Sequence, residues 1–417
     1  MLASDRVRRV IKRNLQSQFF ALAKTYRISL GALGDLCCIG VTGSCGKTMT
    51  KELITAILAT HSPGLKSNRL YNGPRSVART IFTIRPWHRF CVQELGAHRP
   101  GRMSLSVEMF RPRIGVVTHI GRDHYTTYRS KEKAAAEKGT LLESLPADGT
   151  AVLNLDDPYV LAMRDRTRAR IITYGLSPEA MVRGEEVSCA WPDRLSLTVA
   201  YGRDKVRVKT RLLGEHWAYS VLAALATGIA RGVPLAEGAR AVEGVEPVEG
   251  RMSPHETPDG ITFVRDDWKA PLWTIPASLQ FMQTAQARRK VVIIGTISDY
   301  PGSASQKYRA VAREALEATQ KVIFVGSFAH CALKARSHPA DDRIMAFDTA
   351  YDLNLFLRDY LTSGDLVLLK GSGGADHLQR LVLARSDGIA CWRERCGRFI
   401  FCTHCPLRHR PYVPGRL

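Results

Sequence analysis

Long apolar runs are missing from this chain of 417 residues. The longest lies around residues 221–230, and it is far shorter than the roughly 20 residues that a membrane-spanning helix needs. No apolar core of a signal peptide follows the N-terminus. These absences predict a protein with no transmembrane segment and with a cytoplasmic location.

Cysteine is too thinly spread to build the fold. Ten cysteines in 417 residues do not form the dense disulfide framework of a small secreted domain. Free thiols or a metal site are therefore expected in place of disulfides. The core must come from apolar packing, and a hydrophobic fraction of 45% is enough for two or three ordinary domains.

Acidic residues are scarce relative to basic ones. The chain has 39 Asp and Glu against 60 Lys and Arg, which gives a net charge of +21. A field of that sign attracts anionic partners, such as a nucleotide, a phosphorylated substrate or the headgroups of a membrane surface. The net charge alone does not show which of these anionic partners the protein binds. Non-specific attraction of anions accounts for the charge equally well.

A glycine-rich segment carries the clearest chemical signal. The apolar run 38–41 is followed by T-G-S-C-G-K-T over residues 42–48 and then by a helical pattern that reaches Leu58. This order is typical of a phosphate-binding loop, in which backbone N–H groups close on phosphate oxygens. The Lys47 ammonium suits the β/γ-phosphates and the Thr48 hydroxyl suits Mg²⁺. The predicted nucleotide contacts are Gly43, Ser44, Cys45, Gly46, Lys47 and Thr48.

Charged side chains follow the next two predicted strands. Residues 90–97 contain an apolar strand that ends at Glu94, and the strand 114–120 is followed by Asp123 and His124. In an open α/β sheet, ligands gather at the carboxyl ends of the strands. Glu94, His124 and Thr48 together therefore make a plausible Mg²⁺ shell.

These motifs resemble the central ATPase domain of the Mur ligase family. The spacing T-G-x-x-G-K-T, with Val41 in place of the glycine of the general loop, is similar to this family more than to kinases, GTPases or motor ATPases. The similarity continues through E-L-G-A at 94–97, T-H-I at 118–120 and N-L-D-D-P at 154–158. It is strongest to the type that adds D-alanyl-D-alanine to a UDP-muramoyl peptide.

The resemblance implies roles that spacing alone does not assign. It makes Thr48, Glu94 and His124 metal-site residues, and it makes Lys138 a carbamylated lysine that adds a carboxylate-like Mg²⁺ ligand. From its position in the helical pattern 131–145, Lys138 reads instead as a surface lysine. ATP and Mg²⁺ are the implied cofactors, and the implied catalytic residues are Lys47, Lys138, His124 and Lys269.

The second half of the chain resembles the C-terminal domain of the same family. Apolar runs at 291–295, 321–326 and 366–372, with helical stretches between them, predict a doubly wound α/β unit. Trp217 replaces an asparagine of the adenine site and is expected to stack on the base. The other implied contacts are Arg251 and Asp266 with the nucleotide, Lys370 and Ser372 with the incoming acceptor, and Lys269, in place of an asparagine, near the reacting phosphate.

Both ends of the chain depart from this pattern. Residues 1–36 have apolar side chains at helical spacing beside a basic face, which predicts an amphipathic helix that packs on the chain's own core, with membrane docking as the alternative. Near the other end, a C-x4-C-x5-C-x2-C spacing suits a structural zinc site; an iron–sulfur cluster and metal-free thiols are the alternatives. The four cysteines are Cys391, Cys396, Cys402 and Cys405. Five arginines lie from Arg393 to Arg410, but with one aromatic pair among them they do not favour nucleic-acid binding.

The sequence therefore predicts an α/β protein with a P-loop-containing central ATPase domain and a second, Rossmann-like C-terminal domain. The expected boundaries are 1–36 for the basic helix, 37–248, 249–388, and 389–417 for the cysteine-rich tail. The resemblance covers residues 38 to about 385 and omits the UDP-sugar domain that usually precedes the loop in this family.

The implied activity is ATP-dependent amide formation through an acyl phosphate. Its substrates would be a small-molecule or peptide-like acid and an amine, with peripheral membrane or other anionic contacts through the basic surface. Two other classes stay open. One is a nucleotide-binding scaffold with altered catalysis, which is motivated by departures from the family pattern at Lys269 and at Trp217 and Ser220, the two positions where the family's adenine site has asparagine. The other is a simple P-loop NTPase that needs no amine.

Overall fold

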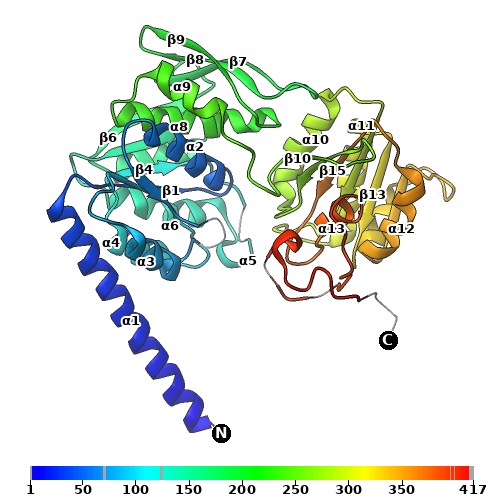
Figure 1. Cartoon of the computed structure of the whole chain (residues 1–417), viewed down its shortest axis with the longest axis horizontal. Coiled ribbons are helices and arrows are strands. Elements are labelled where there is room, and N and C mark those ends of the chain that lie inside the picture. The colour runs from blue at the N-terminus through cyan, green and yellow to red at the C-terminus, as the bar shows by residue number, and fades with distance from the viewer. Residues whose placement is uncertain (1, 69–71, 123–124, 395, 399, 413–417) are drawn as a thin grey trace. The chain divides into compact units, whose positions relative to one another are not determined.

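The computed structural model describes residues 2–68, 72–122, 125–394, 396–398 and 400–412, with side chains from residue 14 onward. The chain divides into two compact units (Figure 1). The first comprises Met1–Val187, Ser196–Thr210 and Trp217–Val245, and the second comprises Ser188–Leu195, Arg211–His216 and Glu246–Leu417. The segments 188–195 and 211–216 thus join the second unit, which sequence reasoning did not anticipate.

The described part of the first unit is built on a nine-stranded sheet with the order β2-β3-β1-β4-β5-β6-β7-β8-β9. Pairing is parallel from β2 through β7, and β8 pairs with β9 as an antiparallel hairpin. The strands are β1 (Cys37–Thr42), β2 (Gly64–Lys66), β3 (Phe90–Glu94), β4 (Ile114–Val117), β5 (Thr150–Asn154), β6 (Arg170–Gly175), β7 (Val182–Ser188), β8 (Ser196–Tyr201) and β9 (Asp204–Lys209).

Helices cover both faces of this sheet (Figure 1). Helices α2, α8 and α9 pack against one another on one side, and α1, α3, α4 and α6 pack together on the other. The helices are α1 (Leu2–Leu33), α2 (Lys47–Ala59), α3 (Pro74–Thr83), α4 (Arg102–Phe110), α5 (Tyr125–Tyr128), α6 (Lys131–Glu143), α7 (Pro158–Leu161), α8 (Ala218–Ala230) and α9 (Leu235–Glu243), with the 3₁₀ turns η1 (Ala162–Arg166) and η2 (Glu215–Trp217).

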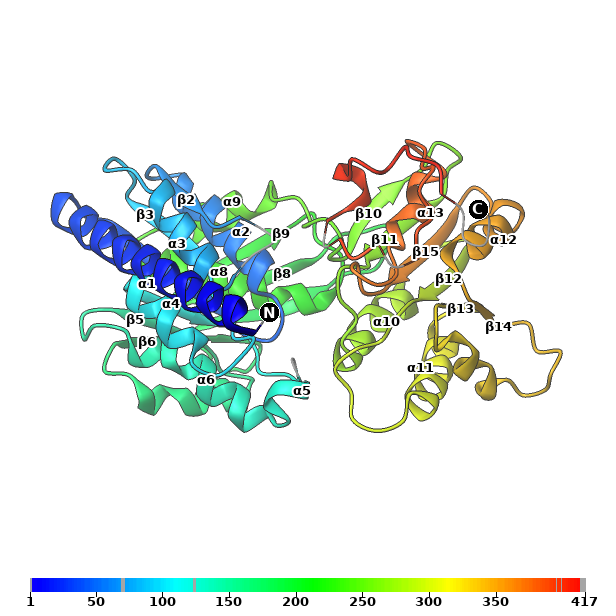
Figure 2. The same ribbon diagram turned by 90° about the horizontal axis from the view of Figure 1, so that it is seen from below.

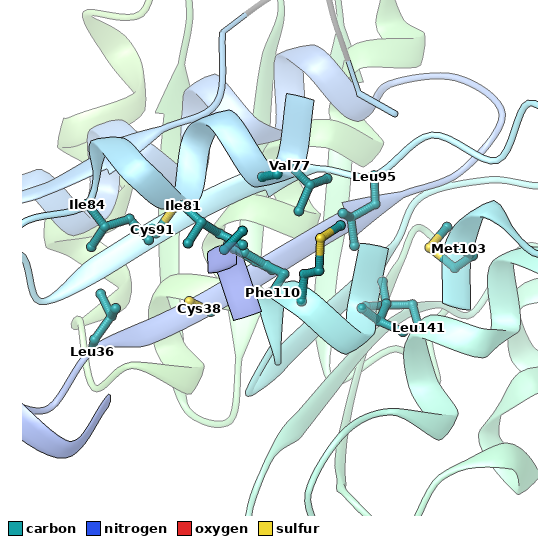
Figure 3. Packing of buried hydrophobic residues seen from close by; sticks show 14 of the residues in the cluster. Leu36, Cys38, Val77, Ile81, Ile84, Cys91, Leu95, Met103, Phe110 and Leu141 are labelled. Atoms are coloured by element: carbon teal, nitrogen blue, oxygen red, sulfur yellow. The ribbon is translucent and has the colours of Figure 1, made fainter. Parts of the chain in front are cut away.

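The central strands are buried on both faces, as expected for a parallel sheet between two helical layers. Alternate residues therefore belong to different cores. Cys38 and Cys91 face α3 and α4, where they pack with Val77, Ile81 and Phe110 (Figure 3). This packing holds the carboxyl ends of β1 and β3 side by side, and the candidate site lies there.

Helix α1 packs along α3 and α4 (Figure 2). Ala23 and Leu30 are buried in the same core as Cys38. The guanidinium of Arg27 is buried too, and its Nε lies 2.9 Å from Cys38 Sγ and 3.1 Å from the carbonyl oxygen of Phe110. The predicted N-terminal helix is present, and its packing on the chain's own core is confirmed for these residues.

The described part of the second unit contains a six-stranded sheet with the order β10-β11-β15-β12-β13-β14, parallel except for the β10–β11 pair. Its strands are β10 (Ser253–Glu256), β11 (Thr262–Asp266), β12 (Arg289–Ile294), β13 (Lys321–Val325), β14 (Ile344–Phe347) and β15 (Asp365–Lys370). Its helices are α10 (Ile275–Thr284), α11 (Ala304–Ala318), α12 (Ala350–Tyr360) and α13 (Gln379–Leu383), with the turns η3 (Leu272–Thr274), η4 (Ala329–Ala335) and η5 (Cys402–His404).

This second sheet also lies between two helical layers. Leu353, Leu357 and Leu381 pack on one face against Val291 and its neighbours, while α10 and α11 contact each other and the strands β15 and β13. The predicted α/β fold with a second doubly wound unit is confirmed. Among the described residues, no helix has both the length and the apolar character that crossing a bilayer requires.

Candidate functional site

The glycine-rich segment forms a loop between β1 and α2. The N–H group of Ser44 donates to the carbonyl oxygen of His119 at 2.6 Å, and Thr118 Oγ1 donates to the carbonyl oxygen of Cys45 at 2.6 Å. Both bonds tie the loop to the residues that follow β4. Helix α2 then begins at Lys47 with no side-chain cap and no acidic residue in its first turn. Its free N–H groups and its dipole favour an anion at this end.

Two glycines make this turn sterically feasible. Gly46 adopts φ +77°, a left-handed conformation that side chains rarely adopt. Gly43 has φ +144°, and a Cβ atom there would lie 1.9 Å from Thr118 Oγ1. The sequence therefore needs both glycines for the loop backbone, whatever it binds.

The predicted metal residues Thr48 and Glu94 are in direct contact. Thr48 Oγ1, in the first turn of α2 next to Lys47, donates to Glu94 Oε2 at 2.8 Å. Burial opposes ionisation of Glu94, but the charges of Lys47 and Lys51 and the hydrogen bonds from Asn72 and Thr48 outweigh it and hold the pKa of this carboxyl below its ordinary value. Glu94 is therefore an ionised oxygen donor, as a Mg²⁺ ligand has to be. Lys47 Nζ donates to the carbonyl oxygen of Gly43 at 2.7 Å.

The structure adds residues that sequence reasoning missed. Asn72 Nδ2 donates to Glu94 Oε1 at 2.8 Å, and the backbone N–H of Glu94 donates to Ser67 Oγ at 3.0 Å. Lys51 is fully buried and donates to the carbonyl oxygen of Ser67 at 2.8 Å. Burial lowers the pKa of Lys51, and Glu52 and Glu94 oppose that shift. The turn-rich composition of 66–74 indicated a loop, but no pattern showed that this loop folds back onto Glu94.

A second pair lies after β4. His119 Nδ1 is 2.7 Å from Asp157 Oδ2, and Asp157 also accepts from the N–H of Ile120 at 2.7 Å. Burial opposes ionisation of Asp157, but the bonds from His119 and Ile120 outweigh it and lower its pKa. The carboxylate therefore orients the imidazole of His119, which belongs to the segment that holds the phosphate loop. Both residues stand in the family-like motifs, although their pairing could not be read from spacing.

Lys138 is buried on α6, with 1% of its surface exposed, and its Nζ lies 5.9 Å from the centre of the Tyr128 ring. The interpretation of Lys138 as a surface lysine, which followed from the helical pattern, is therefore wrong. The pattern failed because α6 turns this side chain inward with Ala134 and Ala135. His124 and Asp123 lie outside the described residues.

The predicted base-site residue Trp217 is buried, with 7% of its surface exposed. Ser220, which occupies the second asparagine position of the resemblance, is buried on α8 beside the phosphate loop, and a Cβ atom on Gly46 would lie 3.1 Å from its Oγ. Ser220 therefore limits the room behind the loop.

In the second unit, Asp266 and Lys370 form one buried ion pair. They are cross-strand partners at the carboxyl ends of β11 and β15, and Asp266 Oδ2 also accepts from Ser278 Oγ at 2.8 Å. Burial works to raise the pKa of Asp266, but Lys370, Arg251 and the bond from Ser278 outweigh it and hold the pKa below its ordinary value. The structure thus joins a predicted nucleotide residue to a predicted acceptor residue.

The remaining predicted residues of this unit lie on loops. Arg251 is half-buried after Gly250, and Lys269 is exposed after β11. Ser372 Oγ donates to the carbonyl oxygen of Thr296 at 2.9 Å, and its N–H donates to Asp376 Oδ2 at 2.7 Å. These bonds brace Ser372 within the loop after β15.

The four tail cysteines line one small cavity together with His377. The ring nitrogens of His377 lie 3.0 Å from Cys396 Sγ and 3.6 Å from Cys402 Sγ. Within the described ranges, however, no group of three or more His, Cys, Asp or Glu side chains is arranged to hold a metal ion. The described residues therefore do not form the predicted zinc centre, although the four cysteines share one cavity. All four residues are free cysteines: Cys391, Cys396, Cys402 and Cys405.

Known proteins match both units. Residues 41–228 match the Mur ligase middle domain. The UDP-N-acetylmuramoyl-tripeptide--D-alanyl-D-alanine ligase of Mycobacterium tuberculosis is 27% identical over 364 residues, which cover 82% of this chain and 71% of that protein. The ligase of the same name from Bacillus subtilis is 24% identical over 357 residues, which cover 85% of this chain and 76% of that protein.

Solved structures agree on the fold. MurF from Acinetobacter baumannii superposes with a TM-score of 0.79 at 22% identity, covering 88% of this chain and 79% of its own. MurF from Thermotoga maritima in complex with ADP superposes with a TM-score of 0.74 at 19% identity, covering 85% of this chain and 80% of its own. Residues 41–228 of this chain therefore match the Mur ligase middle domain, and most of the chain is similar in sequence to MurF-type ligases and shares their fold.

Proposed function

We propose that this protein is an ATP-dependent, ADP-forming ligase that joins a carboxylic acid to an amine through an acyl phosphate. The observation that carries the proposal is the contact between Thr48 and the ionised Glu94, next to the phosphate loop of a Mur ligase middle domain.

The residues present fit Mg²⁺. Thr48 and Glu94 supply a hydroxyl and a carboxylate oxygen, which are the donors this cation prefers, and Asn72 and Ser67 fix Glu94 from behind. When bound there with ATP, Mg²⁺ would neutralise the charge that builds up on the phosphates during transfer.

The chain's own groups account for the rest of the reaction. In the first step an oxygen of the substrate carboxylate bonds to the γ-phosphorus and ADP leaves, and in the second the amine bonds to the acyl carbon and phosphate leaves with the electron pair of the broken C–O bond. The loop N–H groups and Lys47 hold and neutralise the transferred phosphoryl group. The amine loses a proton in the second step. We propose that the amine substrate binds at the ends of β11 and β15, with Lys370 and Ser372 beside it and Lys269 near the reacting phosphate.

Phosphate release from MgATP tests this proposal. The panel begins with the substrates named for the relatives, a UDP-muramoyl tripeptide and D-alanyl-D-alanine, and extends to other acids with amino acids or dipeptides. A ligase releases phosphate only with both partners and yields a product of the mass of the amide. Release without any amine would identify a simple NTPase, and ATP binding without stimulation by any pair would identify a scaffold.

Lys138 is proposed to act as a carbamylated lysine in this reaction. Replacing Lys138 with alanine should then lower the ligase rate by about a hundredfold or more, because a metal-site oxygen ligand is lost. Added bicarbonate or formate should restore part of the rate by placing a carboxylate in the space that the side chain leaves. The matched control is Lys133→Ala on the exposed face of the same helix. A loss that no small carboxylate relieves would point to a role for the ammonium itself.

Zinc in the tail also stays a proposal, supported by the shared cavity of the four cysteines and His377. Elemental analysis of the purified chain should find about one zinc per chain, and Cys402→Ser should remove it. If the purified chain contains no zinc or iron and is still stably folded, the zinc proposal is wrong and the cysteines are metal-free thiols.

A further inference from the structure

The cysteine-rich tail packs on a loop of the proposed acceptor site, within the second unit. Its 3₁₀ turn η5 contacts α13 (Figure 2). Just before that turn, the centre of the Phe401 ring lies 4.6 Å from the centre of the Trp268 ring, and the two planes are tilted by 39°. Aromatic pairs at such distances attract each other beyond the effect of the area that they bury. Trp268 directly precedes Lys269 in the loop after β11, so the tail holds the neighbour of a proposed site residue.

Trp268 in turn joins the two loops of the acceptor site. Its carbonyl oxygen accepts from the N–H of Gly373 at 3.1 Å, and Gly373 follows Ser372 in the loop after β15. A Cβ atom on Gly373 would lie 2.9 Å from Trp268 Cε3, so the indole packs directly on the backbone beside Ser372. The position of the indole therefore sets the spacing between Lys269 and Ser372.

Buried ion pairs link the tail to the loop after β11 a second time. Glu249 Oε1 accepts from Thr403 Oγ1 of the tail at 3.2 Å and from Arg265 Nη1 at 2.9 Å. Arg265 is buried and also pairs with Asp267 at 3.4 Å. The centre of the Phe401 ring lies 5.6 Å from the guanidinium carbon of Arg265, a distance at which a cation and an aromatic ring attract each other. Phe401 therefore also contacts the ion pairs that hold this loop.

The tail contacts the loop after β15 as well. His377 is buried in the segment between β15 and α13, and its ring nitrogens lie 3.0 Å from Cys396 Sγ and 3.6 Å from Cys402 Sγ. The preceding residue, Asp376, accepts from the N–H of Ser372 at 2.7 Å. The tail thiols thus pack on the residue next to the carboxylate that braces Ser372.

We propose that the cysteine-rich tail completes the amine site, and that Phe401 is a positioning residue that acts through Trp268. This rests on the proposed ligase function. Contacts to a fixed ring limit the conformations that a surface loop samples. With the tail in place, Lys269 and Ser372 are held at one spacing before the amine arrives, so less conformational entropy is lost when it binds.

Hydrogen exchange followed by mass spectrometry tests the positioning without any substrate. The variant is Phe401→Ala, and Phe401→Tyr keeps the ring. The matched control is Tyr412→Ala, which removes an exposed aromatic ring of the same tail. The amides of interest are those of Trp268 and Gly373, which donate to the carbonyl oxygens of Gly250 and Trp268, respectively.

We expect peptides that contain these amides to exchange at least about tenfold faster in Phe401→Ala, because the loops open more often without the ring. Peptides from the buried strands β12 and β13 should keep the wild-type rate, and Phe401→Tyr and Tyr412→Ala should match the wild type throughout. Unchanged exchange in Phe401→Ala, or an equal rise in Tyr412→Ala, would overturn the proposal. Faster exchange of β12 and β13 as well would overturn it too, since Phe401 would then support the whole unit and not these loops.

Kinetics connect the contact to the reaction and separate this proposal from the ligase function. Phe401→Ala should raise the KM for the amine at least about tenfold, with a smaller change in kcat and little change in the KM for ATP. Hydroxylamine is too small to need the acceptor loops, so the rate at which it traps the acyl phosphate as a hydroxamate should not change in the variant. If the wild type forms no hydroxamate with any acid and releases phosphate without an amine, the ligase function fails. If hydroxamate forms but the KM for the amine is unchanged in Phe401→Ala, the tail proposal fails and the ligase function stands.

Discussion

Replacing Lys47 with alanine should lower MgATP-dependent phosphate release at least about a hundredfold while the chain stays folded. The side chain is partly exposed and donates to the carbonyl oxygen of Gly43, so its loss costs the fold little. Its cation is the group best placed to stabilise charge on the transferred phosphoryl group. The measurement is initial-rate phosphate release, with thermal unfolding as the check on folding.

The same variant should also change the pH profile. Lys47 is the largest of the influences that offset burial and keep the pKa of Glu94 below its ordinary value. Without it the pKa of Glu94 rises, and the carboxylate that is proposed to bind Mg²⁺ becomes protonated at a higher pH. The acidic limb of the residual activity should therefore move to higher pH, and the Mg²⁺ concentration needed for half-maximal rate should rise as the pH falls.

Lys133→Ala, on the exposed face of α6, is the control for removing one positive charge from the same unit. It should leave the rate and its pH profile unchanged. A Lys47→Ala protein that keeps its rate within a few-fold of the wild type would exclude phosphate transfer at this loop. If Lys47→Ala is slow but the acidic limb of its pH profile does not move, phosphate transfer at this loop is supported, but the proposal that Glu94 binds Mg²⁺ is contradicted.

The parts of the site that follow from local patterns could be predicted from the sequence. The loop 43–48 has fixed spacing, and Glu94 stands at the end of an apolar run, so the topology of a parallel sheet places both at one edge. The helix at the N-terminus and the second α/β unit follow from periodicity in the same way. Each of these needs only neighbours in the chain and one general rule of sheet geometry.

The remaining parts of the site could not be predicted, because they depend on contacts between residues far apart in the sequence. The bond from Asn72 to Glu94 spans 22 residues and the pair of Asp266 with Lys370 spans 104, and no periodicity encodes either. One cavity of the first unit is lined by Gln16 of α1 and by arginines of α3, of α4 and of the segment before α4, and these arginines look like ordinary surface charges in the sequence. The burial of Lys138 does not follow from the sequence for the same reason, since the packing of α6 decides which face of the helix is buried.

Replacing Lys370 with methionine should lower the free energy of unfolding by about 3–5 kcal/mol, because it leaves the buried Asp266 carboxylate without its partner. The side chains of Lys370 and Asp266 are only 4% and 10% exposed, so water cannot substitute for the lost ammonium. Urea titration of the full chain measures the change. The control Lys334→Met, at an exposed lysine of the same unit, should change stability by no more than about 0.5 kcal/mol.

The pH dependence of this deficit identifies its cause. In the wild type the pKa of Asp266 is held below its ordinary value, so its contribution to stability is complete above the unfolded-state pKa of about 4 and is lost as the pH falls through the lower folded-state value. In the variant burial is no longer offset by Lys370, and the pKa of Asp266 rises above the unfolded-state value. The deficit should therefore be largest near neutral pH and should shrink as the pH falls toward 4.

A second substitution separates the unpaired charge from lost packing. Lys370→Met/Asp266→Asn removes the carboxylate but keeps an oxygen that can accept from Ser278 Oγ, so it should recover at least half of the lost stability and abolish the pH dependence of the remainder. If the double variant is as unstable as the single one at every pH, the cost lies in packing around residue 370 and not in the buried charge. The loops that carry Lys269 and Ser372 begin at the ends of β11 and β15, where Asp266 and Lys370 form this ion pair. The ion pair therefore also positions the loops of the proposed acceptor site.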